Sequence, residues 1–148
     1  MATPVAVLAK MSGPQFQHVL AASPKPLREQ LFRSVGIKKA GGAFTIKTAA
    51  QIGDRGVKLH AELASQGRVD ERLIGDLVRN YLFTRRKLLA DALDFFDVAH
   101  DDGLTEADLD FFESLPHDRI VELRTMLEKS HAATDVALYL SFMNVPTD

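Results

Sequence analysis

The chain of 148 residues contains no cysteine, no tryptophan and only two tyrosines. Without cysteine it has no disulfide, no thiolate zinc site and no cysteine nucleophile, which suits the reducing cytoplasm. The apolar run from Val5 to Ala9 is shorter than a signal-peptide core of about 7–15 residues, and no other run approaches a membrane span. We therefore expect a cytoplasmic protein without membrane contact. A chain of this length buries roughly 70% of its unfolded surface and needs no disulfide or metal to stabilise its fold.

Catalytic and cofactor motifs are absent as well. The sequence shows no nucleophile elbow, no paired carboxylates in an apolar setting and no dinucleotide fingerprint. Residues 36–42, GIKKAGG, have the spacing of a P-loop, but Gly42 and Ala43 stand where a P-loop has Lys and Ser or Thr. The five histidines follow no metal-binding spacing. These absences predict a non-catalytic protein that needs no cofactor.

Charge is distributed very unevenly. Residues 1–90 carry 15 basic and six acidic side chains, a net charge of +9, whereas residues 91–148 carry three basic and 14 acidic ones, a net charge of −11. Such a division bears on partners and association rather than on fold. The two parts could neutralise each other, associate head to tail between copies of the chain, or bind charged partners.

Apolar residues recur at helical spacing along most of the chain, and Gly and Pro punctuate the segments. The pattern predicts an all-α, irregular multi-helix bundle in a single domain, 1–148, with one small β-hairpin near residues 37–46 as the only candidate for strand. The first expected helix begins at Ser12, and the second runs from Ser23 to Gly36. Further helices are expected over Thr45–Gln66, 70–97, Thr105–Glu113, Pro116–Lys129 and Thr134–Met143. The apolar run VALYLSFM predicts that the last of these is buried on most sides.

The expected helix over 70–97 carries a stripe of arginines. Arg72, Arg79 and Arg86 are seven residues apart and share one helical face, and Arg68 precedes them. Arginines at this spacing can meet carboxylates or phosphates along a partner. A solvated face without a partner is the simpler alternative.

The stretch LDFFDVAHDDGLTEADLDFF, residues 93–112, surrounds one glycine with carboxylates. Counted from Asp97, a calcium loop would use Asp101 and Asp108 at positions 5 and 12, but Ala99 stands at position 3 and Gly103 falls one residue late. A turn at Asp101 and Asp102, followed by a helix capped by Thr105, explains the same residues. The sequence therefore favours a structural turn over a divalent-metal site.

The motif LDFF flanks that turn on both sides. Its rings would anchor two helices to one core, and an acidic loop rimmed by an exposed phenylalanine would suit a docking site. We therefore predict a protein-interaction module, an adaptor or regulator. The residues expected to contact the protein partner are Arg68, Arg72, Arg79, Arg86, Asp101, Asp102, Phe95 and Phe112.

A nucleic-acid-binding regulator is the alternative. Residues 45–59 follow a weak helix-turn-helix spacing, with Ala49 in the first helix, Gly53 in the turn and Leu59 in the second helix. Arg55 and Lys58 would then contact the phosphate backbone. Gly56 weakens the expected recognition helix, and Glu62 falls where a buried residue belongs.

Overall fold

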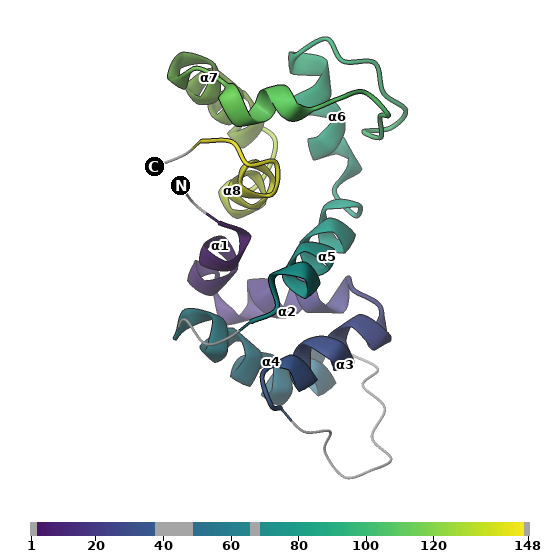
Figure 1. The fold of residues 1–148 in the computed structure, drawn as a ribbon, viewed down its shortest axis with the longest axis vertical. Coiled ribbons are helices and arrows are strands. Elements are labelled where there is room, and N and C mark those ends of the chain that lie inside the picture. The colour runs from purple at the N-terminus through teal and green to yellow at the C-terminus, as the bar shows by residue number, and fades with distance from the viewer. Residues whose placement is uncertain (1–2, 38–48, 66–68, 147–148) are drawn as a thin grey trace. The chain divides into compact units, whose positions relative to one another are not determined.

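The computed structural model describes residues 3–37, 49–65 and 69–146. These residues form α-helices and one short 3₁₀ helix, and the described part of the chain contains no sheet (Figure 1). The all-α, multi-helix fold class is thereby confirmed. The elements are α1 (Pro4–Lys10), α2 (Gly13–Ala21), α3 (Lys25–Ser34), α4 (Ala49–Ala64), α5 (Glu71–Leu82), α6 (Arg86–Phe95), η1 (Asp110–Ser114), α7 (His117–Glu128) and α8 (Ala133–Phe142).

The chain divides into two compact units, and the boundary lies between Tyr81 and Leu82. We call Pro4–Tyr81 the N-terminal unit and Leu82–Asp148, to which Thr3 also belongs, the C-terminal unit. The first contains 12 basic and six acidic residues, and the second contains six basic and 14 acidic residues. Their net charges are thus +6 and −8, so the division by charge read from the sequence follows the two units closely.

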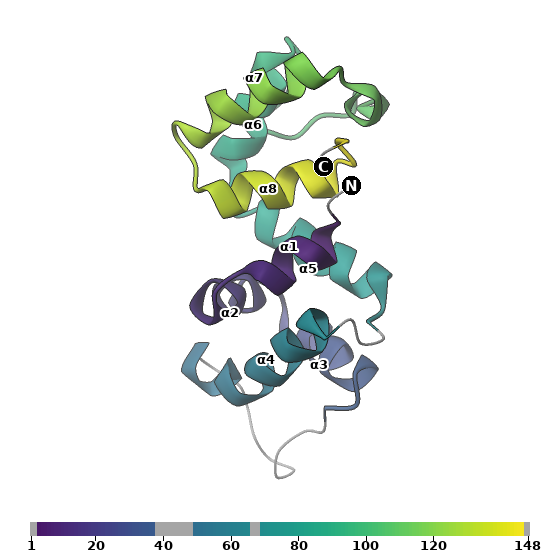
Figure 2. The same ribbon diagram turned by 90° about the vertical axis from the view of Figure 1, so that its left-hand side faces the viewer.

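In the N-terminal unit, α1, α2 and α3 all pack against α4 (Figure 2). Leu59 and Leu63 of α4 are buried together with Phe16 and Leu20 of α2. Helix α2 begins where the sequence predicted, because Ser12 and Gln15 form a reciprocal capping box. The short helix α1 was not predicted, although its Leu8 is fully buried.

The helix-turn-helix prediction for residues 45–59 is wrong at its turn. Helix α4 runs without interruption from Ala49 to Ala64, so Gly53 lies inside a helix. Packing overrides the local cost of glycine, since Gly56 is buried and the same helix carries the core residues Leu59 and Leu63. Residues 45–48, Arg68 and the hairpin expected near 37–46, apart from Ile37, lie outside the described residues.

The single helix predicted over residues 70–97 is also wrong, because α5 ends at Leu82 and α6 starts at Arg86. The Arg85 guanidinium lies 3.3 Å from the Asp135 carboxylate of α8, an ion pair formed at the break between the two helices. The first turn of α6 holds two cations, which oppose the helix dipole. Nearby carboxylates offset that cost: Asp102 lies 3.8 Å from Arg86, and Asp91 lies 2.8 Å from Lys87.

In the C-terminal unit, α6 packs on α7 and α7 packs on α8 (Figures 1 and 2). The predicted burial of α8 is confirmed, since Val136, Leu138 and Leu140 are at most 1% exposed. Burial also raises the pKa of Tyr139 well above its ordinary value. Among the described residues, no helix combines the length and apolar character that crossing a membrane requires.

The helix predicted over Thr105–Glu113 is reduced to the 3₁₀ turn η1. The Thr105 hydroxyl donates to the Ala99 carbonyl and accepts from the Ala107 N–H, and the Asp108 carboxylate accepts from the Asp110 N–H. These local side-chain bonds hold the backbone in turns and compete with helix formation. The helix that Thr105 was expected to cap therefore does not form.

Candidate protein-binding surface

The two LDFF motifs bring their phenylalanines into one cluster in the C-terminal unit. The Phe96 ring meets Phe95, Phe111 and Phe112 edge to face, with centroids 4.9, 5.1 and 5.3 Å apart. Phe111 stacks on Phe112 at 4.7 Å, and Phe112 reaches Tyr139 of α8 at 6.2 Å. Edge-to-face pairs at these separations are favourable because the positive edge of one ring meets the negative face of the next.

The four phenylalanines divide into one core residue and three surface residues. Phe112 is completely buried, so its prediction as a partner contact is wrong; it anchors η1 to the core. Phe95, Phe96 and Phe111 are half-buried and reach the surface. Phe95 is therefore accessible at the surface, as a partner contact requires, and Phe96 and Phe111 are accessible beside it.

A single guanidinium covers part of this aromatic group. The Arg119 guanidinium carbon lies 4.5 Å from the Phe95 ring centroid and 5.5 Å from that of Phe96. Its Nη1 also donates to the Glu122 carboxylate at 2.7 Å. The side chain of Arg119 is 42% exposed, so these contacts lie at the surface. No sequence motif pointed to Arg119, although it is the first cation after a long acidic stretch.

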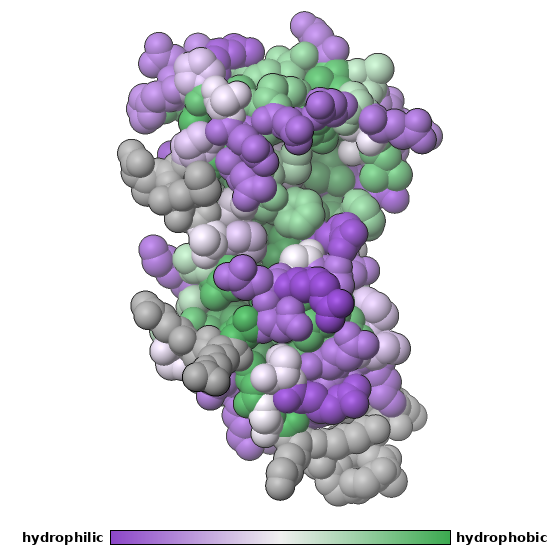
Figure 3. All heavy atoms as spheres, in the orientation of Figure 1, coloured by the Kyte–Doolittle hydropathy of each residue, from purple (hydrophilic) through white to green (hydrophobic). Residues whose placement is uncertain are grey.

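The stretch of chain that precedes Arg119 is strongly acidic. Between Leu88 and Asp118 there are ten Asp or Glu residues and no Lys or Arg. The rings are flanked along the chain by exposed carboxylates. We define the acidic aromatic surface as Phe95, Phe96, Phe111 and Arg119 together with Asp94, Asp97, Asp110, Glu113 and Asp118. Figure 3 shows hydrophilic and hydrophobic side chains mixed over η1 and α7.

The turn at Asp101 and Asp102 lies at the other end of α6. Asp101 and Leu104 pair through two backbone hydrogen bonds of 2.8 and 3.0 Å. Gly103 has a positive φ of 87°, and a Cβ added there would lie 2.8 Å from the Arg86 carbonyl oxygen and from the Leu89 Cβ. The turn thus packs on the first turns of α6, about 14 Å along the helix axis from Phe95.

His100 fastens this turn to the rest of the loop. Its Nδ1 accepts a hydrogen bond from the Gly103 N–H at 3.0 Å, and its Nε2 lies 2.7 Å from the Asp94 carboxylate. Since Nδ1 acts as an acceptor, the proton of this imidazole sits on Nε2 and is donated to Asp94. The loop is therefore a hydrogen-bonded structure in its own right.

The calcium-loop residues do not converge. Asp97 has a left-handed backbone with φ of 56°, Asp101 belongs to the turn, and the Asp108 carboxylate is bound to the Asp110 N–H. In the described ranges, no group of three or more His, Cys, Asp or Glu side chains is arranged to hold a metal ion. The structural turn read from the sequence accounts for these residues.

The seven-spaced arginines do not lie on one helix. Arg72 and Arg79 are exposed on α5, where Asp70 lies 4.0 Å from Arg72 and Asp76 pairs with Arg79. Arg86 belongs to α6 and to the other compact unit. The break between α5 and α6 therefore removes the common helical face on which the prediction depended.

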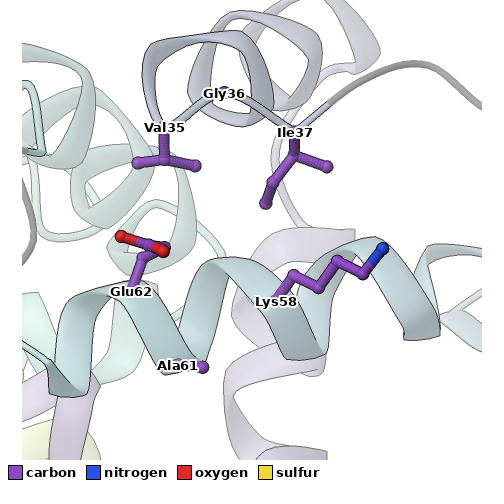
Figure 4. A pocket seen from close by; sticks show the side chains of 6 residues that line it. All are labelled: Val35, Gly36, Ile37, Lys58, Ala61 and Glu62. Carbon is purple, nitrogen blue, oxygen red and sulfur yellow. The ribbon is translucent and has the colours of Figure 1, made fainter.

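Of the two residues expected to contact nucleic acid, Arg55 is not accessible. Its guanidinium is buried over the Phe32 ring at 4.2 Å and binds both oxygens of Glu29 at 2.9 Å. Lys58 is exposed and lines a shallow cavity of about 520 Å³ between the end of α3 and α4. In Figure 4, Val35 and Ile37 point toward α4, Glu62 points toward Val35, and Lys58 extends away along the helix.

Comparisons with protein-family models, curated proteins and solved structures find no match to this chain. What its surfaces can bind is therefore inferred from their own chemistry.

Proposed function

We propose that this chain is a non-catalytic protein-interaction module, an adaptor or regulator, whose acidic aromatic surface binds a basic segment of a partner protein. One observation carries the proposal. Three half-buried phenylalanine rings reach the surface and lie within a stretch that has ten carboxylates and no Lys or Arg, and two of them already bear the guanidinium of Arg119.

The two components of the surface have different roles in this proposal. Partly exposed aromatic rings supply contact area that releases water on binding, which is why aromatic residues dominate the energetics of interfaces. The carboxylates attract a basic partner and repel acidic ones, so they contribute more to association rate and specificity than to affinity. A cysteine-free chain can perform this role in the cytoplasm, where we place it.

The choice of occupant follows from charge complementarity. The C-terminal unit has a net charge of −8, and the carboxylates beside the rings are exposed. Among these, Asp97, Asp110 and Glu113 flank Phe96, Phe111 and Phe112 directly in the chain. A segment with alternating cationic and apolar side chains would satisfy both the carboxylates and the rings.

The experiment uses fluorescence anisotropy with two labelled helical peptides. Both carry Leu on one face, and the other face carries only Lys in one peptide and only Arg in the second. We expect at least one peptide to bind the full chain, with an affinity that falls as salt rises because the exposed charges are screened.

Two triple variants test where the peptide binds. Asp97→Asn with Asp110→Asn and Glu113→Gln should weaken binding about tenfold, from about 0.5 kcal/mol for each exposed charge. Asp54→Asn with Glu71→Gln and Glu128→Gln changes the net charge equally and should weaken binding much less. Equal losses in the two triples, or no binding of either peptide, would refute the proposed function.

A further inference from the structure

Resting on the proposed function, we infer that the acidic aromatic surface selects arginine over lysine, and that Arg119 occupies its arginine site in the free protein. A partner's arginine would displace Arg119 from the Phe95 ring and take over its contacts. The surface would thus be partly self-occupied, and Arg119 would lower its affinity for every arginine-bearing partner.

The geometry around Arg119 is that of a guanidinium receptor. Phe95 and Phe96 stand at 88° to each other, and one guanidinium carbon lies 4.5 and 5.5 Å from their centroids. The Glu122 carboxylate accepts a hydrogen bond of 2.7 Å from the same group. Aromatic faces with a carboxylate acceptor suit the planar guanidinium, whereas an ammonium group is more strongly hydrated and cannot stack.

The position of Arg119 makes exchange feasible. Its side chain is 42% exposed and that of Glu122 is 56% exposed, so no core packing has to open when Arg119 swings away. Exposed cation–π contacts and exposed ion pairs are individually weak. An incoming arginine would remake both contacts, and the displaced Arg119 would remain near the exposed Asp118 and the acidic stretch.

The test compares variants of Arg119 with a charge-matched variant on the same helix. Arg124→Ala also removes one cation from α7, at a residue for which no ring contact is observed. We expect the Arg peptide to bind the unmodified chain more tightly than the Lys peptide does. Arg119→Ala should raise affinity for the Arg peptide about fivefold, the equivalent of one weak cation–π contact and ion pair.

The controls separate displacement from simple charge removal. Arg124→Ala should raise affinity for the Arg peptide by at most about twofold, because the removed charge is not on the site. Both variants should affect the Lys peptide by the same small factor. Arg119→Lys, which keeps the charge but loses the stacking, should show an intermediate gain for the Arg peptide.

Nuclear magnetic resonance gives a readout that is independent of affinity. The δ-methylene protons of Arg119 lie close to the guanidinium stacked on Phe95, so the ring current should shift them upfield in the free protein. Saturation with the Arg peptide should return them toward ordinary values, and the Lys peptide should do so less. Thermal unfolding checks that Arg119→Ala is folded. If that variant does not fold, Arg119→Lys provides the same comparison.

The two proposals fail in different ways. Equal affinity for both peptides, equal effects of Arg119→Ala and Arg124→Ala, and unmoved Arg119 protons would overturn arginine displacement while leaving a basic-segment surface in place. If neither peptide binds the unmodified chain or Arg119→Ala, both proposals are wrong.

Discussion

The two compact units use charge in opposite ways. In the N-terminal unit, the cation of α4 with the least exposure, Arg55, is held inside by both oxygens of Glu29 and lies over Phe32. In the C-terminal unit, most carboxylates between Asp94 and Asp118 are exposed, and the Arg119 guanidinium lies on the surface of the phenylalanine cluster. A charge is thus held inside at Arg55 in one unit, whereas the charges around the phenylalanine cluster of the other unit are exposed to solvent.

The difference shows why net charge alone does not identify a binding surface. The N-terminal unit carries +6, yet three of its arginines, Arg55, Arg72 and Arg79, have carboxylate neighbours within its own fold. The C-terminal unit has 14 acidic residues against six basic ones, so most of its carboxylates cannot be neutralised internally. An excess of carboxylates next to partly exposed aromatic rings therefore indicates a binding surface better than net charge does.

Removing the internal charge pair should have the largest effect on stability. Glu29→Gln leaves the Arg55 guanidinium in a site where the two side chains are only 15% and 11% exposed. We expect a loss of about 2–4 kcal/mol in the free energy of unfolding, slightly below the value for a fully buried pair. Urea unfolding measures it, with the exposed Glu106→Gln of the C-terminal unit as a control that should change stability by less than about 0.5 kcal/mol. Equal losses in the free energy of unfolding for the two variants would contradict the distinction between buried and solvent-exposed charge.

Two glycines, one in each unit, should respond to alanine with opposite signs. Gly103→Ala forces a side chain into a left-handed backbone and within 2.8 Å of the Arg86 carbonyl, so it should cost about 1–3 kcal/mol. Gly75 lies inside α5 with nothing within 4 Å of an added Cβ. Gly75→Ala should therefore stabilise the chain by about 0.5–1 kcal/mol. Thermal unfolding of both variants measures these changes in stability. A Gly103→Ala variant as stable as the unmodified chain would mean that the acidic turn is not packed against α6.

The smallest effect concerns Asp91 of α6, whose carboxylate is mostly buried. Burial raises the pKa of Asp91, but hydrogen bonds from Lys87 and His131, each 2.8 Å long, outweigh it and lower the pKa below its ordinary 3.8. A lowered pKa in the folded state means that the stabilisation is present above about pH 4 and is lost as the pH falls through the folded value.

Asp91→Asn should accordingly cost about 1 kcal/mol at pH 7. The difference in melting temperature from the unmodified chain should shrink as the pH falls from 5 to 2.5. Asp54→Asn, an exposed substitution in α4, is the control and should show little difference at any pH. A constant difference for Asp91→Asn over this range would contradict the proposed role of its charge.

Local signals predicted part of the fold well. The start of α2 follows from Ser12 and Gln15, and the burial of α8 follows from an almost uncharged run. The break at residues 83–85 depends instead on Asp135, which lies fifty residues further along the chain. Helical periodicity alone cannot contain that information. The missing helix after Thr105 reflects a competition between side-chain and backbone hydrogen bonds that sequence patterns leave undecided.

The candidate site was predicted in outline only. The doubled LDFF motif and its carboxylates identified the region, but not which ring would be buried, since the burial of Phe112 depends on Tyr139 and the packing of α8. Arg119 entered the site because α7 packs against α6 and brings the guanidinium over Phe95. That contact is a property of the tertiary structure, and no spacing in the sequence encodes it.

The most direct test of the acidic aromatic surface is a titration of the ¹⁵N-labelled full chain with the Arg peptide, followed by amide chemical shifts. A chain of 16.3 kDa is well suited to this measurement. We predict that the largest shifts fall on residues 94–97, 110–113 and 118–122, and that α5 is almost unaffected. Shifts centred on Lys58 and its cavity, or no shifts at millimolar peptide, would contradict the central claim.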